Sequence, residues 1–200
     1  MLFRSIAYAA STGAVWVSPY NDGQVIAGQA TMAMEIFADL PQPADYTWIV
    51  PAGGGGLISG IGVAIKSGLH PQDRSGAMRL VGVQSTASPF LHHIYHHGSQ
   101  EGCEELPSLA DGLSGPVEAN SITIPLVHKY IDDFILVSEE EIREAIGYAW
   151  DHYHERIEGS AATSLAAVLS GKITRRPAVI VISGGNIQPE THQKILSAEF

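Results

Sequence analysis

The sequence predicts an α/β fold with a mostly parallel sheet, helices on both faces, and a single domain over residues 1–200. Three observations lead to this prediction. Short apolar runs with strand composition alternate with segments whose apolar residues recur at helical spacing. Proline and glycine separate the two kinds of segment, so each strand is expected to lead into a helix. Two hundred residues suit one domain better than two.

The first quarter of the chain predicts two helices. Residues 2–11 read as the first, and a short strand is expected at 14–17. Asp22 is placed to cap the second helix, because its carboxylate can accept hydrogen bonds from the free N–H groups of a first turn. That helix carries apolar residues at i, i+4, i+8 and i+11, which are Ile26, Ala30, Met34 and Phe37.

The rest of the chain continues the alternation. Strands are expected at 48–50, 78–83, 135–137 and 178–182, the first and the last of them buried, and helices at 57–67 and 161–169. Ser138 and Glu141 form a capping-box pattern that opens a helix running to about Arg156. The glycine- and proline-rich stretch 98–122 predicts a long irregular crossing, and loops of that length inside a compact domain are usually functional.

Residues 51–57 are the most informative segment. Four glycines, Gly53, Gly54, Gly55 and Gly56, stand between a buried strand and an apolar helix. Without side chains their N–H groups can converge on one point, and the dipole of the following helix favours an anion there. Ser183 follows the strand expected at 178–182. Because ligands of open α/β sheets bind beyond the carboxyl ends of strands, both segments are expected at one binding edge.

The glycine loop lacks the marks of two common phosphate sites. It ends Gly56-Leu57-Ile58, without the lysine and hydroxyl of a mononucleotide P-loop. Its glycines do not keep the G-x-G-x-x-G spacing, so a nicotinamide-binding domain is the weaker alternative. A loop that binds one terminal phosphate through its backbone fits better, and pyridoxal phosphate is the obvious candidate.

The run Val50-Pro51-Ala52-Gly53-Gly54-Gly55-Gly56-Leu57 resembles the phosphate loop of fold-type II pyridoxal-phosphate enzymes, in particular the threonine dehydratase and serine racemase group of the tryptophan synthase beta-like superfamily. Residues 18–31, 110–112 and 181–186 resemble other segments of that group in the same order. The resemblance implies the large domain of such an enzyme, and a lyase that eliminates the β-hydroxyl of threonine or serine.

The resemblance also implies roles for individual residues. Gly53, Gly54, Gly55, Gly56 and Leu57 would hold the phosphate of pyridoxal phosphate. Ser183 would face the pyridine nitrogen, where a hydroxyl does not hold the nitrogen protonated and so favours elimination over transamination. Tyr20 would lie near the ring, Gly112 would offer a backbone contact, and Glu158 would be the acidic residue near the cofactor.

One essential residue of the family has no match. The resemblance places the Schiff-base lysine and the loop that grips the substrate carboxylate in an N-terminal segment, so the chain is expected to be truncated at that end. None of its lysines has the family context: Lys66, Lys129, Lys172 and Lys194. The chain alone is therefore expected to be inactive, and to need a homodimer or a separate chain. The alternative is a non-catalytic module that binds pyridoxal phosphate or another small phosphate ester.

Composition and net charge argue against some classes of binding partner. The net charge of −10 argues against nucleic acid and against an anionic membrane surface. The single cysteine, Cys103, suits a reducing cytosol, and no run of 18 apolar residues predicts a membrane span. The run 92–97 holds two histidine pairs at i, i+4, a known zinc spacing, but without a third ligand nearby. Helix surface is the favoured interpretation, and no metal is predicted.

Overall fold

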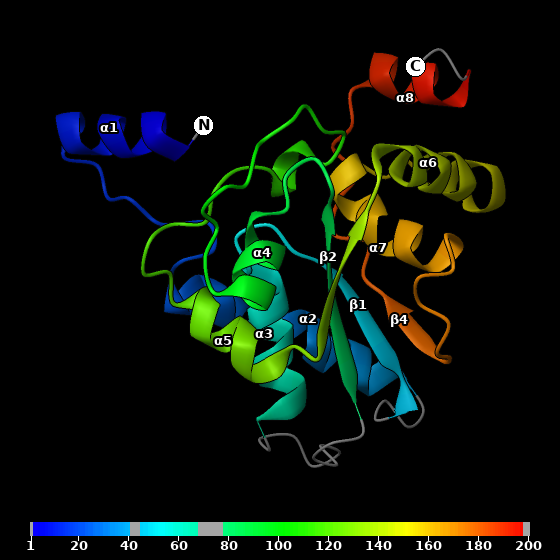
Figure 1. Cartoon of the computed structure of the whole chain (residues 1–200), viewed down its shortest axis with the longest axis horizontal. Helices are drawn as coiled ribbons and strands as arrows, with labels where there is room; N and C mark the ends of the chain where they lie inside the picture. Colours follow the sequence, from blue (N-terminus) through cyan, green and yellow to red (C-terminus); the bar gives the residue numbers. More distant parts are fainter. Residues whose placement is uncertain (1, 41–44, 68–77, 198–200) are drawn as a thin grey trace.

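The computed structural model describes residues 2–40, 45–67 and 78–197. Four parallel strands form one sheet in the order β3-β2-β1-β4, as Figure 1 shows. They are β1 (Thr47–Pro51), β2 (Arg79–Ser85), β3 (Asp133–Val137) and β4 (Ala178–Ile180). In the register, Ile49 of β1 lies opposite Val81 of β2 and Ile180 of β4. The predicted α/β fold with a parallel sheet is confirmed.

Helices cover both faces of the sheet (Figure 1). One face carries α2 (Gly23–Asp39), α3 (Gly56–Lys66), α4 (Phe90–His97) and α5 (Thr123–Tyr130). The other carries α6 (Glu139–Tyr153) and α7 (Gly159–Leu169), and α8 (Pro189–Leu196) packs against α6. The first helix, α1 (Leu2–Thr12), stands apart from this body. Within the described ranges, no helix is long and apolar enough to cross a bilayer.

Alternating side chains of the strands form two cores. Trp48 and Val50 point to the α3 side, where the Trp48 ring lies 5.6 Å from that of Phe37 on α2. Ile49 points to the α7 side and packs with Val81. All of β1 is buried. This double burial explains why β1 is a continuous apolar run rather than an alternating one.

The predicted caps are confirmed. Asp22 accepts hydrogen bonds from the N–H groups of Gln24 and Val25 at 2.8 and 3.0 Å. Ser138 and Glu141 make both halves of the capping box at the start of α6. Each cap satisfies N–H groups that a helix start leaves free, and such a cap typically stabilises a helix by about 1 kcal/mol.

Several predicted boundaries were wrong. Residues 14–17 form no strand, and Val15 is 89% exposed, because no described strand pairs with this segment. Helix α6 ends at Tyr153, since His154 takes a left-handed conformation there. Strand β4 ends at Ile180, two residues early, and it is half-buried rather than buried because it lies at the edge of the sheet. Met34 is 47% exposed although it falls on the predicted apolar stripe of α2.

Candidate functional site

The carboxyl ends of β1 and β4 bring two distant segments to one edge of the sheet. The glycine loop continues β1, and residues 181–186 continue β4. Beyond the end of β4, the N–H group of Val181 still donates to the carbonyl oxygen of Ile49 at 3.0 Å. Ser183 follows two residues later, is exposed, and makes no hydrogen bond among the described residues. Ser183 and the glycine loop therefore follow neighbouring parallel strands at the same edge of the sheet.

The glycine loop needs glycine for three separate reasons. Gly55 has a φ of +89° as it caps α3, a conformation that residues with side chains rarely adopt. A Cβ atom on Gly54 would lie 2.5 Å from the Tyr20 ring, and one on Gly53 would lie 2.9 Å from the Cα of Leu113. The loop is thus packed between two other segments of the chain.

The N–H groups of this loop are free to bind an anion. Among the described residues, no hydrogen bond engages the N–H groups of Gly53, Gly54, Gly55, Gly56 or Leu57. They precede or open α3, so the positive end of the helix dipole adds to their attraction for negative charge. This donor set fits the phosphate group of a small ligand.

Tyr20 covers one side of the loop. Its ring lies against Gly54, and its hydroxyl oxygen accepts a hydrogen bond from the N–H group of Glu118 at 2.9 Å. The Glu118 carboxylate in turn accepts from the side chains of Asn21 at 2.8 Å and Ser18 at 3.1 Å. Burial is the main cause that raises the pKa of Tyr20, so the phenol stays protonated near neutral pH.

Thr123, the first residue of α5, also contacts the glycine loop. The sequence did not predict this contact. Its hydroxyl donates to the carbonyl oxygen of Gly54 at 2.7 Å, and its side chain is fully buried. Leu91 of α4 lies on the same side, 3.1 Å from the position that a Cβ on Gly55 would take. Thr123 opens α5, a helix absent from the sequence-based expectations. A proline two residues later, Pro125, masked the helical pattern there.

Gly112 and Glu158 lie at the same edge. Gly112 belongs to a 3₁₀ turn, Asp111–Leu113, that reaches the first turn of α7: a Cβ on Gly112 would lie 2.8 Å from the Ser160 hydroxyl oxygen. Glu158 is the N-cap residue of α7 and makes no side-chain cap bond. Its carboxylate instead accepts from the N–H group of Asn186 at 3.1 Å. Glu158 therefore holds the turn after Ser183.

The contacts of the four lysines lie elsewhere than on the glycine loop. Lys66 ends α3, at the opposite end from the loop, and pairs with Asp132. Lys172 pairs with Glu141. The other two are Lys129, 5.0 Å from the ring centre of Tyr130, and Lys194 in the last turn of α8. Among the described residues, no hydrogen bond or ion pair joins a lysine side chain to the glycine loop.

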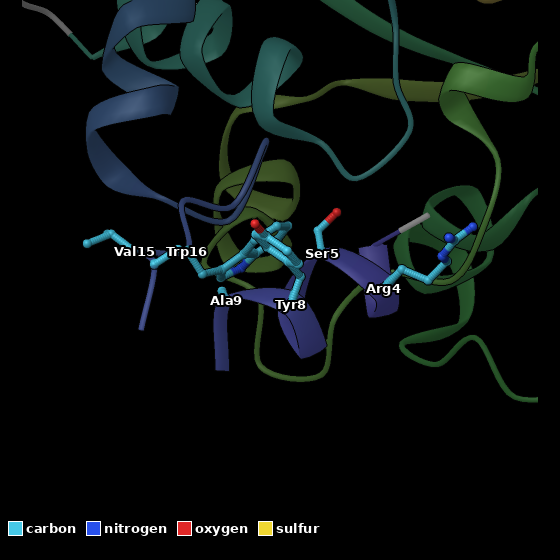
Figure 2. A pocket seen from close by; sticks show the side chains of 7 residues that line it. Arg4, Ser5, Tyr8, Ala9, Val15 and Trp16 are labelled. Atoms are coloured by element: carbon cyan, nitrogen blue, oxygen red, sulfur yellow. The ribbon is translucent and has the colours of Figure 1, made fainter. Parts of the chain in front are cut away.

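A separate hollow of about 500 Å³ lies between α1 and residues 14–16. Figure 2 shows Tyr8 and Trp16 among the side chains around it. All its lining residues belong to the first 16 positions, so it shares none with the glycine loop. The described residues also include no group of three or more His, Cys, Asp or Glu side chains arranged to hold a metal ion.

Comparison with known proteins identifies the family. The model of the family "Pyridoxal-phosphate dependent enzyme" matches residues 3–184. An L-threonine ammonia-lyase of Thermotoga maritima is 41% identical over 187 residues, covering 93% of this chain and 44% of that protein. The catabolic L-threonine dehydratase TdcB of Escherichia coli K12 is 40% identical over 179 residues, covering 88% of this chain and 52% of that protein. The chain thus spans about half the length of these curated relatives.

Solved structures agree with the sequence comparison. Maize serine racemase superposes with a TM-score of 0.82 at 28% identity, over 99% of this chain and 60% of that one. A threonine deaminase from Solanum lycopersicum also gives 0.82, at 25% identity, over 98% and 52%. With the family match, they confirm the predicted fold type and its cofactor. The chain belongs to the pyridoxal-phosphate-dependent enzymes of fold type II, among relatives that are threonine ammonia-lyases and serine racemases.

Proposed function

We propose that this chain forms the pyridoxal-phosphate-binding part of a threonine or serine ammonia-lyase, and that Gly53, Gly54, Gly55, Gly56 and Leu57 bind the cofactor phosphate. The observation that carries the proposal is the set of five unengaged N–H groups at the start of α3. A dianionic phosphate would satisfy these donors and the helix dipole together.

The positions of the remaining predicted site residues suggest a role for each in binding the cofactor. Tyr20 closes one side of the loop and limits access of water to the phosphate. Gly112 offers its backbone N–H group, which has no partner among the described residues. Ser183 presents a neutral hydroxyl at the end of the sheet edge, and Glu158 fixes the turn that carries it. When bound, pyridoxal phosphate supplies an electron sink for the carbanion formed at the amino acid Cα.

Elimination also requires a base that removes the Cα proton of the substrate. In the proposed enzyme a lysine from elsewhere in the polypeptide, or from a partner chain, performs this step, because none of the four lysines here has the family's sequence context or a hydrogen bond or ion pair with the loop. The chain alone is then inactive. Its placement of the lysines also favours the second candidate, a module that binds pyridoxal phosphate or another small phosphate ester without chemistry.

Two measurements on the purified chain separate these functions. Binding is followed by the absorbance of pyridoxal phosphate and by the shift in melting temperature, with Gly54→Ala as the loop variant and Gly28→Ala as its control. Turnover is followed as ammonia released from L-threonine or L-serine.

We expect saturable binding of pyridoxal phosphate, weakened at least tenfold by Gly54→Ala and unchanged by Gly28→Ala, with no ammonia release. Ammonia release by the chain alone would contradict its inactivity. Binding of simple phosphate esters as tight as that of pyridoxal phosphate would favour the second candidate. No binding of either ligand would refute the proposed site.

A further inference from the structure

The first turn of α7 has donors that nothing in the described structure uses. Its first intrahelical hydrogen bond runs from the N–H group of Ala162 to the carbonyl oxygen of Glu158, at 2.9 Å. The three preceding N–H groups, those of Gly159, Ser160 and Ala161, have no partner among the described residues. The Ser160 side chain is only 3% exposed, and its hydroxyl also has no partner.

A buried hydroxyl without a partner destabilises a protein, so it calls for an explanation. Neighbouring hydroxyls on α7 are satisfied: that of Thr163 donates to the Ser160 carbonyl oxygen at 2.9 Å, and that of Ser164 donates to the Val181 carbonyl oxygen at 2.6 Å. Hydroxyl groups on this part of α7 can therefore form hydrogen bonds within the protein. The absence of a partner for the Ser160 hydroxyl is specific to its own surroundings.

Ser160 faces the candidate site. Its hydroxyl oxygen lies 2.8 Å from the position that a Cβ on Gly112 would take, and Gly112 itself is exposed. The next residue, Leu113, lies against Gly53 of the glycine loop. Residues 112 and 113 thus lie between the glycine loop and α7, and a ligand that extends from the loop to exposed Gly112 comes beside Ser160.

We propose that Ser160 and the first-turn N–H groups of α7 form a second polar subsite for the ligand whose phosphate the glycine loop binds. This inference rests on the proposed function. Because the Ser160 hydroxyl and these N–H groups are hydrogen-bond donors, the subsite would bind an acceptor oxygen of the ligand. The carboxylate of Glu158 stands directly before this turn and would repel a second phosphate, so the subsite takes a ring or carbonyl oxygen of low charge.

The test compares Ser160→Ala with Ser164→Ala in the purified chain, using two readouts. Without ligand, Ser160→Ala should melt at or above the temperature of the unaltered chain, because it removes an unpaired buried group. Ser164→Ala should melt lower, because it removes a satisfied hydrogen bond. With ligand, Ser160→Ala should weaken pyridoxal phosphate binding about five- to tenfold, the loss expected for one hydrogen bond.

Inorganic phosphate is the second probe, and it separates the subsite from the glycine loop. Ser160→Ala should leave its affinity unchanged, whereas Gly54→Ala should weaken the binding of both probes. Equal pyridoxal phosphate affinity for Ser160→Ala and the unaltered chain would overturn the subsite while leaving the proposed function intact. A lower melting temperature of ligand-free Ser160→Ala would show a structural role and also overturn it. Failure of the unaltered chain to bind pyridoxal phosphate would overturn both proposals.

Discussion

Tyr20 and Glu118 are joined by a hydrogen bond across 98 positions of sequence, from the Glu118 N–H group to the Tyr20 hydroxyl oxygen at 2.9 Å. The bond ties the segment before α2 to the irregular crossing, and so fixes the Tyr20 ring on Gly54. The side chain of Glu118 strengthens the same link through Asn21. One side of the glycine loop therefore depends on residues from two remote parts of the chain.

Replacing Tyr20 by phenylalanine separates the ring from the hydroxyl. Tyr20→Phe should lower the free energy of unfolding by about 1 kcal/mol, because the Glu118 N–H group loses its acceptor. Its pyridoxal phosphate affinity should stay within about twofold of the unaltered chain, because the ring still covers Gly54. Tyr20→Ala should lose both stability and affinity. Urea unfolding and ligand titration measure the two effects, and equal stability of Tyr20→Phe and the unaltered chain would contradict this account.

Two glycine-to-alanine changes should act in opposite directions. Gly54→Ala forces a Cβ to within 2.5 Å of the Tyr20 ring, so we expect a loss of about 1–3 kcal/mol in unfolding free energy. Gly28→Ala lies inside α2, with nothing within 4 Å of the new Cβ. It should stabilise the chain by about 0.5–1 kcal/mol through helix propensity. Melting curves of the two variants test the pair, and a Gly54→Ala variant as stable as Gly28→Ala would refute the packing described for the loop.

Thr123→Val tests the support beneath the loop. The change keeps the shape of the side chain but removes the hydroxyl that donates to Gly54, and it leaves the Ser121 hydroxyl without its neighbour at 2.8 Å. We expect a loss of about 1–2 kcal/mol in unfolding free energy and weaker pyridoxal phosphate binding. Thr31→Val is the control, because Thr31 is exposed and its hydroxyl bonds only to the Gly28 carbonyl oxygen in the same helix. If both variants unfold at the same urea concentration, the Thr123 hydrogen bond contributes nothing to stability.

The sequence predicted local features well and long-range contacts poorly. The glycine loop, the Asp22 cap and the Ser138–Glu141 capping box each depend on a few consecutive residues, so their patterns are visible in the chain. Thr123 and Ser160 contact Gly54 and Gly112, which lie 69 and 48 positions away. No local pattern marks such residues.

The lack of a long-range pairing contact with the described strands, which the sequence does not reveal, also explains why the segment 14–17 forms no strand. Its composition is that of a strand, but a strand requires a partner to satisfy its backbone groups, and none of the described strands lies beside it. Helix α8 was also missed, although Pro189 stands in its first turn, where proline is favoured.

His92 makes the stability of the chain depend on pH. Its ring lies 5.8 Å from that of Phe134, and burial, followed by the nearby imidazoles of His96, His97 and His93, lowers the pKa of His92 to about 4. Asp133 opposes this shift only in part. Between pH 6.5 and 4 the unfolded chain therefore binds a proton at this residue that the folded chain does not.

The unfolding free energy should consequently fall as the pH is lowered from about 6.5 towards 4, and this residue should add no slope above that range. His92→Gln should reduce the loss measured between pH 7.5 and pH 5. Urea unfolding at the two pH values provides the measurement. Equal losses in the unaltered chain and His92→Gln would mean that His92 is protonated as readily in the folded chain as in the unfolded one.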